Sequence, residues 1–434
     1  MPATNRRAFL KGTAAGVAGA AAVSSVRSTE AAANDKLRFA LIGCGGRSRG
    51  LAPAFASIDN VEVAYVCDPD IGRAGSMSER FGGKPEAIKD LRTALDDKSV
   101  DFVVVATPDH WHSPAAILAC DAGKHVYVEK PCSHNVREGR LLVEAARRNK
   151  RLVQHGTQSR SMNLIARGVQ LLRDGAIGDV LVAKAWNVQK RGQIGHADPS
   201  DPPSGFDYDL WVGPTPMVPF RKTCHHYTWH WWHHFGTGDT GNDGVHEIDI
   251  ARWGLGVDTH PSHVSALGGK FVFNDDQQFP DTQLVTFDYP GDGKPGNRRQ
   301  LVFEMRLWSR YGLTVGIDNG NAFYGTKGWM LLSKRGHLKV YDESNREMPL
   351  KDESPNLPSH YQNFVNAIRS DEPLRAGIEV GHYSATLCHL ANLSTRLNRT
   401  VTFDPKTEQI SGDEQANAML SRDYRDHWGT PSRA

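Results

Sequence analysis

Short apolar runs alternate with longer segments of helical periodicity over the first part of the chain after residue 36. The apolar runs, several of them rich in valine, predict strands at 37–42, 61–67, 101–106, 125–128 and 151–154. Strands that are apolar on both faces must be covered on both sides, and the helical segments between them provide that cover. The alternation therefore predicts a doubly wound parallel sheet.

The pattern changes after residue 158, where a helical segment at 163–174 leads into a strand at 179–188. A long segment rich in Gly, Pro and Trp follows over 189–240. Later strand-like runs stand at 262–273, 282–289, 301–307 and 313–317. An open, largely antiparallel sheet explains these runs, so the chain is expected to be an α/β protein whose second domain is α+β.

A length of 434 residues is too great for one ordinary core and fits this division. The expected parts are a leader, two domains and a C-terminal tail, at 1–33, 36–157, 158–400 and 401–434. The formal net charge of +2 gives no electrostatic reason to expect a nucleic-acid partner. The six cysteines are scattered without a C-x-x-C pair, which argues against a zinc ribbon or a thioredoxin-like motif.

The leader has the parts of an export signal. Residues 5–11 read Asn-Arg-Arg-Ala-Phe-Leu-Lys and resemble a twin-arginine motif, and small residues at 31–33 offer a cleavage site. The Ala/Gly/Val run at 12–23 is too short to span a bilayer. This indicates a periplasmic protein that meets the twin-arginine translocase, which moves folded proteins and so allows a cofactor to be loaded first. A disordered basic N-terminus is the alternative.

A glycine-rich turn follows the first predicted strand. In a doubly wound sheet this turn binds pyrophosphate, because glycines admit the ligand to the backbone and the next helix presents its N–H groups. Gly43 and Gly45 fit the G-x-G-x-x-G pattern, whereas Ser48 stands in place of the third glycine. Arg47 adds positive charge toward a phosphate. The turn thus predicts a dinucleotide-binding Rossmann domain.

An acidic residue ends the second predicted strand. Asp68 lies 25 residues after Gly43, where a carboxylate accepts hydrogen bonds from the adenine-ribose hydroxyls and repels a 2′-phosphate. This favours NAD over NADP. Arg73 is near enough in sequence to leave NADP as an alternative, and a plain turn role before Pro69 is the other reading of Asp68.

Two further segments point to a family. They read Ala-Thr-Pro-Asp-His-Trp-His at 106–112 and Val-Glu-Lys-Pro at 128–131. With the glycine-rich turn they resemble the glucose–fructose oxidoreductase / inositol dehydrogenase (Gfo/Idh/MocA) family, and the resemblance continues through 244–253 and 381–385. It implies a Rossmann domain followed by a domain with an open sheet, one face of which commonly forms a dimer interface. A homodimer or homotetramer is therefore expected.

The resemblance also assigns roles around the nicotinamide. Lys130 corresponds to the family's lysine beside the nicotinamide and the substrate hydroxyl, and Glu129 precedes it. Thr107 and Pro108 are expected near the nicotinamide half of the cofactor. His112 matches a histidine of the same loop, where a cofactor contact and a role in capping or packing the next helix are equally open.

The family's acid–base histidine corresponds to His246. An imidazole titrates near neutrality and suits proton transfer, while a lysine ammonium stabilises an oxyanion or relays the proton. Four residues earlier many members have Asp, but this chain has Asn242, which on a helix would share a face with His246. One of three nearby acids is a candidate to supply the missing charge: Asp239, Asp243 or Asp249. For Asp249 and for Glu247, structural bonds are the safer reading.

The segment 225–235 reads His-His-Tyr-Thr-Trp-His-Trp-Trp-His-His-Phe. Its histidines have helical spacing for a metal, but no carboxylate or thiol pattern closes such a site, so none is predicted. Aromatic faces bind the C–H faces of sugar rings, which makes Trp229, His230 and Trp231 candidates for a substrate wall. Plain packing is the other alternative.

Together these features predict an exported, NAD(P)-dependent oxidoreductase that acts on a hydroxyl of a sugar, polyol or glycoside. Free nicotinamide is scarce outside the cytoplasm, so a retained cofactor that is reduced and reoxidised within one cycle is expected. Two alternatives remain. One is a lyase or hydrolase that cleaves glycosides through transient oxidation, and the other is a non-catalytic sugar-binding protein.

Overall fold

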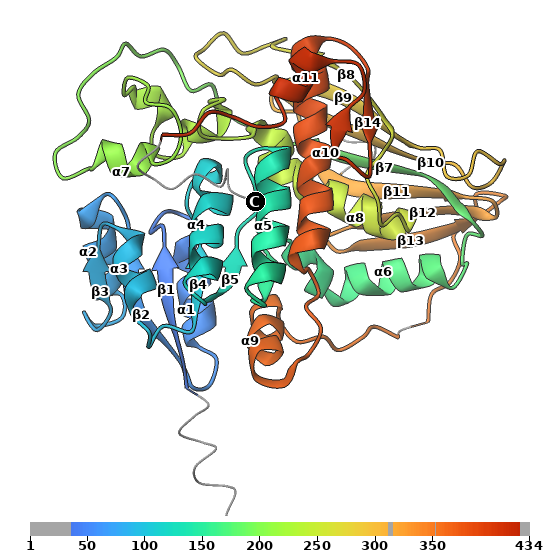
Figure 1. Ribbon diagram of the computed structural model, residues 1–434. Helices are drawn as coiled ribbons and strands as arrows, with labels where there is room; N and C mark the ends of the chain where they lie inside the picture. Colours follow the sequence, from blue (N-terminus) through green and yellow to red (C-terminus); the bar gives the residue numbers. More distant parts are fainter. Residues whose placement is uncertain (1–35, 311–315, 352, 426–434) are drawn as a thin grey trace, which may run out of the picture. The chain divides into compact units, whose positions relative to one another are not determined.

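The first domain is a six-stranded parallel sheet in the order β3-β2-β1-β4-β5-β6 (Figure 1). The computed structural model describes residues 36–310, 316–351 and 353–425. The strands are β1 Leu37–Ile42, β2 Val61–Cys67, β3 Glu86–Ile88, β4 Phe102–Val105, β5 His125–Val128 and β6 Val153–His155. The helices between them are α1 Ser48–Ala56, α2 Ile71–Glu79, α3 Leu91–Asp96, α4 Asp109–Asp121 and α5 Val136–Arg148. The predicted doubly wound sheet is confirmed, and β3 adds a short edge strand that the apolar pattern did not reveal.

The strand order reverses between β1 and β4, which is where a crevice opens at the carboxyl ends of a doubly wound sheet. An aromatic cluster packs between the first sheet and the helices α1 and α9, His360–Ser370. In it the rings of Phe39 and Phe102 stack with centroids 5.1 Å apart. The ring of Phe364 packs edge-on against Phe102 at 5.5 Å. Phe364 belongs to α9, so a helix from far along the chain completes the core of the first domain.

The second domain holds a nine-stranded sheet in the order β13-β12-β11-β7-β10-β9-β8-β14-β15. Its strands are β7 Val180–Val188, β8 His263–Gly269, β9 Thr282–Tyr289, β10 Arg299–Arg306, β11 Asn319–Gly325, β12 Gly328–Ser333, β13 His337–Asp342, β14 Val401–Asp404 and β15 Gln409–Ile410. Only β7 and β10 pair in parallel, and the other pairs are antiparallel. The predicted α+β domain with a largely antiparallel sheet is confirmed.

Several boundaries differ from the sequence expectation. Of the strand expected at 313–317, residues 313–315 lie outside the described residues and residues 316–317 belong to no strand, and β11 begins at Asn319. The meander β11–β12–β13 was not expected. The segment set apart as a tail after residue 400 is in part a component of the second domain, because β14 pairs with β8 and the short helix α11, Glu414–Ala418, follows β15.

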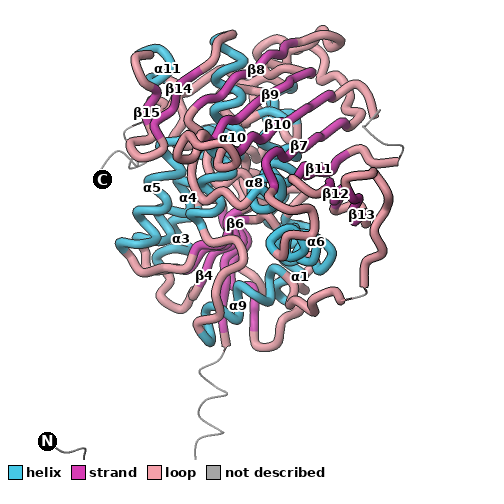
Figure 2. The backbone as a smooth tube through the Cα atoms, turned by 90° about the vertical axis from the view of Figure 1, so that its right-hand side faces the viewer, coloured by secondary structure: helices cyan, strands magenta, loops and turns pink. Residues whose placement is uncertain are grey.

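Three helices cover one face of the second sheet: α6 Asn163–Arg173, α8 Val245–Leu255 and α10 Ile378–Leu397. Helix α10 also packs against α5 and so joins the two domains (Figure 1). Figure 2 looks onto the other face, where the strands lie side by side. There Leu267 is 69% exposed and Leu284 is 51% exposed, an unusual solvent exposure for apolar residues of a sheet.

The predicted signal peptide at 1–33 lies outside the described residues. Among the helices of the described part of the chain, none combines the length and the apolar character needed to cross a bilayer.

Candidate functional site

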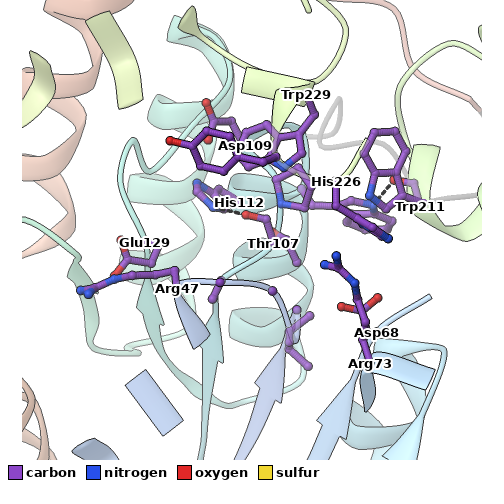
Figure 3. A pocket seen from close by; sticks show the side chains of 18 of the residues that line it. Arg47, Asp68, Arg73, Thr107, Asp109, His112, Glu129, Trp211, His226 and Trp229 are labelled. Carbon is purple, nitrogen blue, oxygen red and sulfur yellow. Dashed lines mark hydrogen bonds and ion pairs between the residues drawn. The ribbon is translucent and has the colours of Figure 1, made fainter. Parts of the chain in front are cut away.

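A cavity of about 640 Å³ lies at the carboxyl ends of the first sheet, where residues of both domains line it (Figure 3). Most of the predicted site residues meet there. From the first domain come Gly43, Gly45, Arg47, Asp68, Thr107, Pro108, His112, Glu129 and Lys130, and from the second Trp229, His230, Asn242 and His246. Two predicted residues, Ser48 and Trp231, do not line the cavity. The second domain therefore supplies one wall of a site built on the first.

The glycine-rich turn has the shape that its sequence predicts. Gly43 has φ +92, and a Cβ there would lie 2.6 Å from the Ala106 carbonyl oxygen, so only glycine fits. Beyond the turn, a Cβ on Gly46 would meet no atom within 4 Å, which leaves room above the backbone. Ser48 is fully buried and donates its hydroxyl to the Gly45 carbonyl oxygen at 2.6 Å. Ser48 thus closes the turn at the start of α1 rather than facing the cavity.

At the end of the cavity next to β2, an acidic and a basic side chain lie close together (Figure 3). Asp68 accepts the backbone N–H groups of Cys44 and Asp70 at 2.8 and 2.9 Å. Burial raises the pKa of Asp68, and these two donors oppose that rise. Arg73 lines the same end, with its guanidinium 3.8 Å from where a Cβ on Gly45 would be. Asp68 therefore organises the turn and also faces the cavity.

Arg47 lines the cavity and also has an acidic partner within the protein. Its Nε lies 2.8 Å from Glu129 Oε1, and it also donates to the Tyr361 hydroxyl at 3.2 Å. The Glu129 side chain is almost entirely buried, so it needs a charged partner. Arg47 lines the cavity, but its charge is largely matched by Glu129 instead of being directed only to a phosphate.

His112 lines the cavity and also packs between two loops of the first domain. Its two ring nitrogens lie 2.6 Å from the Pro131 carbonyl oxygen and 2.9 Å from that of Thr107, so the ring links the loops after β4 and β5. Thr107 Oγ1 is buried and has no hydrogen-bond partner among the described residues. Buried hydroxyls are rarely left unpaired, so this one is a candidate ligand contact.

The lysine of the loop after β5 reaches across to the second domain. Lys130 Nζ donates to the Asn242 backbone carbonyl oxygen at 2.6 Å and to Asn242 Oδ1 at 3.0 Å. Asn242 lies in a π-helical turn, Thr240–Gly244, which runs directly into α8. Such turns are rare and recur at functional sites. The expected neighbourhood of Lys130, Asn242 and His246 is thus present, although Asn242 sits on a π-turn instead of the regular helix.

His246 is buried at the start of α8, and its Nδ1 has no hydrogen-bond partner within the described part of the chain. Burial, assisted by the positive charges of Lys334 and Lys130, holds the pKa of His246 well below its usual range. The ring is therefore an uncharged imidazole near neutral pH. An uncharged ring can accept a proton from a group in the cavity.

Asp249 and Glu247, two acids of α8, form structural bonds, as expected for both from the sequence. Asp249 forms a two-point ion pair with Arg160, at 2.8 and 2.9 Å, and accepts the Ser384 hydroxyl at 2.7 Å. Glu247 pairs with Lys334 at 3.1 Å, and burial raises the pKa of Glu247 to about 7. Neither acid lines the cavity. Of the three acids considered for the charge that Asn242 lacks, Asp243 lines the cavity, whereas Asp239 and Asp249 do not.

The aromatic segment is divided between wall and core. Trp229 and His230 stack with ring centroids 3.6 Å apart, and both line the cavity together with Tyr227. Trp231 is only 2% exposed and packs in the core of the second domain, which corrects its assignment to the wall. The short 3₁₀ turn Thr228–Trp231 explains the division, because successive side chains point in different directions around it.

Among the described residues, the histidines of this segment do not form a group with metal-ligand geometry. Such a group exists elsewhere, where the Nε2 atoms of His260 and His382 lie 3.0 and 2.9 Å from Glu408 Oε1. Arg140 pairs with the same carboxylate, with its Nε at 3.1 and 3.2 Å from the two oxygens. A guanidinium beside the carboxylate repels a cation, so this group is better described as an ion network that joins α5 and α10 to the β14–β15 turn.

The sequence did not reveal which part of the second domain covers the end of the cavity next to Asp68 and Arg73, here called the nucleotide end. The Asp207 N–H donates to the Pro69 carbonyl oxygen at 3.0 Å, and Asp70 forms a β-bridge with Phe206. Helix α7, Tyr208–Val212, follows at once and brings Trp211 to the cavity wall above Asp68 (Figure 3). No periodicity marks this segment, so only the structure could identify it.

Comparison with known proteins agrees with this architecture. Residues 37–157 match the Gfo/Idh/MocA family model described as an oxidoreductase family, NAD-binding Rossmann fold. Residues 179–281 and 333–430 match the companion model, described as a C-terminal alpha/beta domain of the same family. The chain belongs to the Gfo/Idh/MocA oxidoreductase family. The predictions of this family, of an oxidoreductase and of a dinucleotide-binding Rossmann domain are confirmed.

Two curated relatives carry activities in their names. Levoglucosan dehydrogenase of Pseudarthrobacter phenanthrenivorans is 28% identical over 51% of this chain and 51% of its own. Glycosyl hydrolase family 109 protein 2 of Shewanella sp. (strain ANA-3) is 33% identical over 43% of this chain and 46% of its own. This chain spans about half the length of either relative.

Solved structures show the fold of the family. An aldose-aldose oxidoreductase from Caulobacter crescentus, complexed with glycerol, has a TM-score of 0.65 at 18% sequence identity. The match covers 85% of this chain and 100% of that one. At this identity the likeness establishes the shared two-domain fold alone.

Proposed function

We propose that this protein oxidises a hydroxyl group of a sugar, polyol or glycoside with a nicotinamide dinucleotide that it keeps bound. One observation carries the proposal. The ammonium of Lys130 and the uncharged imidazole of His246 line the same cavity as the glycine-rich turn. An oxidoreductase of this family needs a nucleotide turn, a cation for the oxygen and a base for its proton in one cavity. A dehydrogenase of a sugar derivative among the relatives supports the substrate class.

The residues present fit a dinucleotide. Gly43 and the open space above Gly46 would admit the pyrophosphate to the start of α1. The buried hydroxyl of Thr107, which has no hydrogen-bond partner among the described residues, would be free to bind the cofactor. When bound, the nicotinamide supplies the hydride acceptor. We favour NAD, because the buried carboxylate of Asp68 would meet the ribose hydroxyls and oppose a 2′-phosphate. Arg73 keeps NADP as the alternative.

The two catalytic groups have separate tasks. Lys130 Nζ directs bonds to two oxygens of Asn242, which leaves its third proton for the substrate oxygen. That proton stabilises negative charge as the hydroxyl is oxidised. His246 accepts the hydroxyl proton and returns it when the reaction reverses. Tyr227, Trp229 and His230 form the aromatic wall expected to receive a sugar ring.

Retention of the cofactor is supported by the segment that covers the nucleotide end. The C-terminal stretch fixes this segment from outside, since Arg425 donates to the carbonyl oxygens of Gly213 and Asp209 at 2.8 and 2.9 Å. It also pairs with the Asp209 carboxylate at 2.5 Å. Opening of α7 and of Trp211 would therefore require these bonds to break. We propose that this slows cofactor release.

Arg425→Ala is expected to release the bound dinucleotide roughly tenfold faster, because up to three hydrogen bonds that hold α7 are lost. Displacement of bound NADH, followed by its fluorescence, measures the rate. Arg399→Ala is the matched control, since Arg399 pairs with Asp413 in the α10–α11 region. Equal release rates for the wild type and Arg425→Ala would show that the segment does not govern retention.

The proposal also includes export to the periplasm and assembly into a homo-oligomer. The twin-arginine motif at 5–11 supports a periplasmic protein that is folded and loaded before export. The outer face of the second sheet, with Leu267, Leu284 and Tyr324 exposed, supports a homodimer or homotetramer formed through that face.

The alternative activity is glycoside cleavage through transient oxidation. The Shewanella relative named as a glycosyl hydrolase family 109 protein favours it. Oxidation of one hydroxyl acidifies the neighbouring C–H, elimination removes the substituent, and the hydroxyl is then restored. This sequence of steps uses the same Lys130 and His246 and requires a retained cofactor.

The test uses the purified full chain and a panel of sugars, polyols and glycosides. Stoichiometric growth of the reduced-nicotinamide absorbance band is expected for a dehydrogenase. Release of an aglycone with only transient reduction would favour the cleavage alternative. Failure of the protein to contain or take up any nicotinamide dinucleotide would contradict both.

A further inference from the structure

A buried carboxylate lies directly behind the residue that Lys130 contacts. Asp239, 1% exposed, does not line the cavity. Its Oδ1 accepts the Asn242 side-chain amide at 2.9 Å, and its Oδ2 accepts the Asn187 amide at 2.9 Å. Arg191 pairs with the same carboxylate at 3.1 Å. All the partners of Asp239 are therefore donors, as an ionised carboxylate requires.

These contacts fix the orientation of the Asn242 amide. A carboxylate has no proton to give, so Asn242 must turn its NH₂ group toward Asp239. Its oxygen then faces Lys130, in agreement with the 3.0 Å contact from Nζ. The hydrogen bonds run in one direction, from Lys130 through Asn242 to Asp239. An amide that was free to rotate would offer Lys130 either a donor or an acceptor.

The charged groups around Asp239 are a second carboxylate and the cations Arg191 and Lys130. Arg191 lies between Asp239 and a second carboxylate, Asp243, which also accepts Gln189 Nε2 at 2.8 Å and lines the cavity. Burial raises the pKa of Asp239, and the guanidinium of Arg191 opposes that rise. Arg191 also donates to the hydroxyl of Tyr227 in the aromatic wall, at 3.1 Å. The network thus connects the catalytic lysine to the wall expected to bind substrate.

We propose that Asp239 is the positioning residue for Lys130, and that it supplies through Asn242 the negative charge which the neutral amide of Asn242 lacks. The proposal rests on the proposed function of the site. The carboxylate of Asp239 lies behind Asn242 and outside the cavity lining. Lys130 is therefore oriented by the neutral amide of Asn242, which the buried charge of Asp239 holds in place.

Asp239→Asn removes this charge and frees the Asn242 amide to rotate. We expect kcat to fall about 10- to 100-fold, with substrate KM and dinucleotide affinity close to those of the wild type. The substitution removes one negative charge near Lys130 and leaves Asp109 and Asp243, two carboxyl groups that line the cavity and interact with this lysine. The basic limb of the pH–rate profile is therefore expected to move to lower pH.

Exchanging the side chains of Asp239 and Asn242 tests whether Asp239 acts by orienting Lys130 or only by stabilising the fold. Asn242→Asp alone places two carboxylates side by side, and like charges oppose each other. Asn242→Asp combined with Asp239→Asn restores one charge, now next to Lys130, with an amide behind it. The double variant is expected to be about tenfold more active than Asn242→Asp. This comparison remains valid if Asp239→Asn alone fails to fold, as thermal unfolding would reveal.

A second readout does not depend on turnover. Acetylation of Lys130 by an amine-reactive reagent at mildly alkaline pH, located by peptide mapping, should be several-fold faster in Asp239→Asn than in the wild type, relative to the exposed Lys98 as an internal reference. If the wild type oxidises no sugar but Lys130 reacts faster, the proposed function fails while the positioning role stands. Unchanged kcat, pH profile and acetylation in Asp239→Asn, or a double variant no better than Asn242→Asp, would overturn the inference.

Discussion

Lys130→Met is expected to lower kcat about 10²- to 10³-fold while the protein still binds its dinucleotide. The loss corresponds to removal of one preorganised donor from an oxygen that gains negative charge. Methionine keeps most of the length of the side chain but can neither donate to Asn242 nor carry charge. The measurement is the single-turnover rate at which an identified substrate reduces bound NAD, together with the nucleotide content of the purified variant.

A lysine outside the site controls for the substitution itself. Lys98 is exposed in the loop after α3, so Lys98→Met should turn over like the wild type. If Lys130→Met turned over at the wild-type rate, the assignment of the oxygen-binding cation would be wrong. Loss of nucleotide from the variant would place Lys130 in binding instead of in the chemical step.

The second large effect is expected at His246. His246→Gln should reduce kcat about 10²- to 10⁴-fold, the usual contribution of a positioned acid–base group. Glutamine is similar in size and keeps a polar end, but it cannot take up the proton. Because the environment keeps the ring uncharged near neutral pH, the wild-type base does not need to lose a proton before reaction. The rate is measured with and without added imidazole, and partial rescue by imidazole is expected.

The control for this variant is His263→Gln, since His263 is exposed on β8. A His246→Gln protein with a wild-type rate would exclude the ring as the base. If the rate fell but the dinucleotide content fell equally, His246 would have to be reassigned to cofactor binding.

The sequence predicted the parts of the site that depend on local structure. Gly43 could be assigned because a turn with positive φ and close backbone contact requires glycine whatever surrounds it. Lys130 and His246 were assigned through a family resemblance, and the structure brings both to one cavity. Asn242, which Lys130 contacts, is 112 residues away from it in the sequence, a separation across which periodicity carries no information.

The errors have physical causes of the same kind. Trp231 was assigned to the cavity wall because composition cannot show which way successive side chains point in a 3₁₀ turn. The ion pair of Arg47 with the buried Glu129, 82 residues away, could not be predicted either, and the role of Arg47 at a phosphate stays a prediction. The strands β14 and β15 followed a helix near the end of the chain and were too short to be distinguished from a tail.

The packing of α9 has a consequence for how the protein is made. Phe364 completes the aromatic cluster around Phe39 and Phe102, and residues from Leu37 onward cluster into one compact unit. The domain that leaves the ribosome first is therefore the last to be finished, because its core waits for a helix synthesised more than two hundred residues later. Anyone who exchanges the nucleotide half between relatives must transfer α9 with it, since a cut after residue 157 would separate the cluster from its cover.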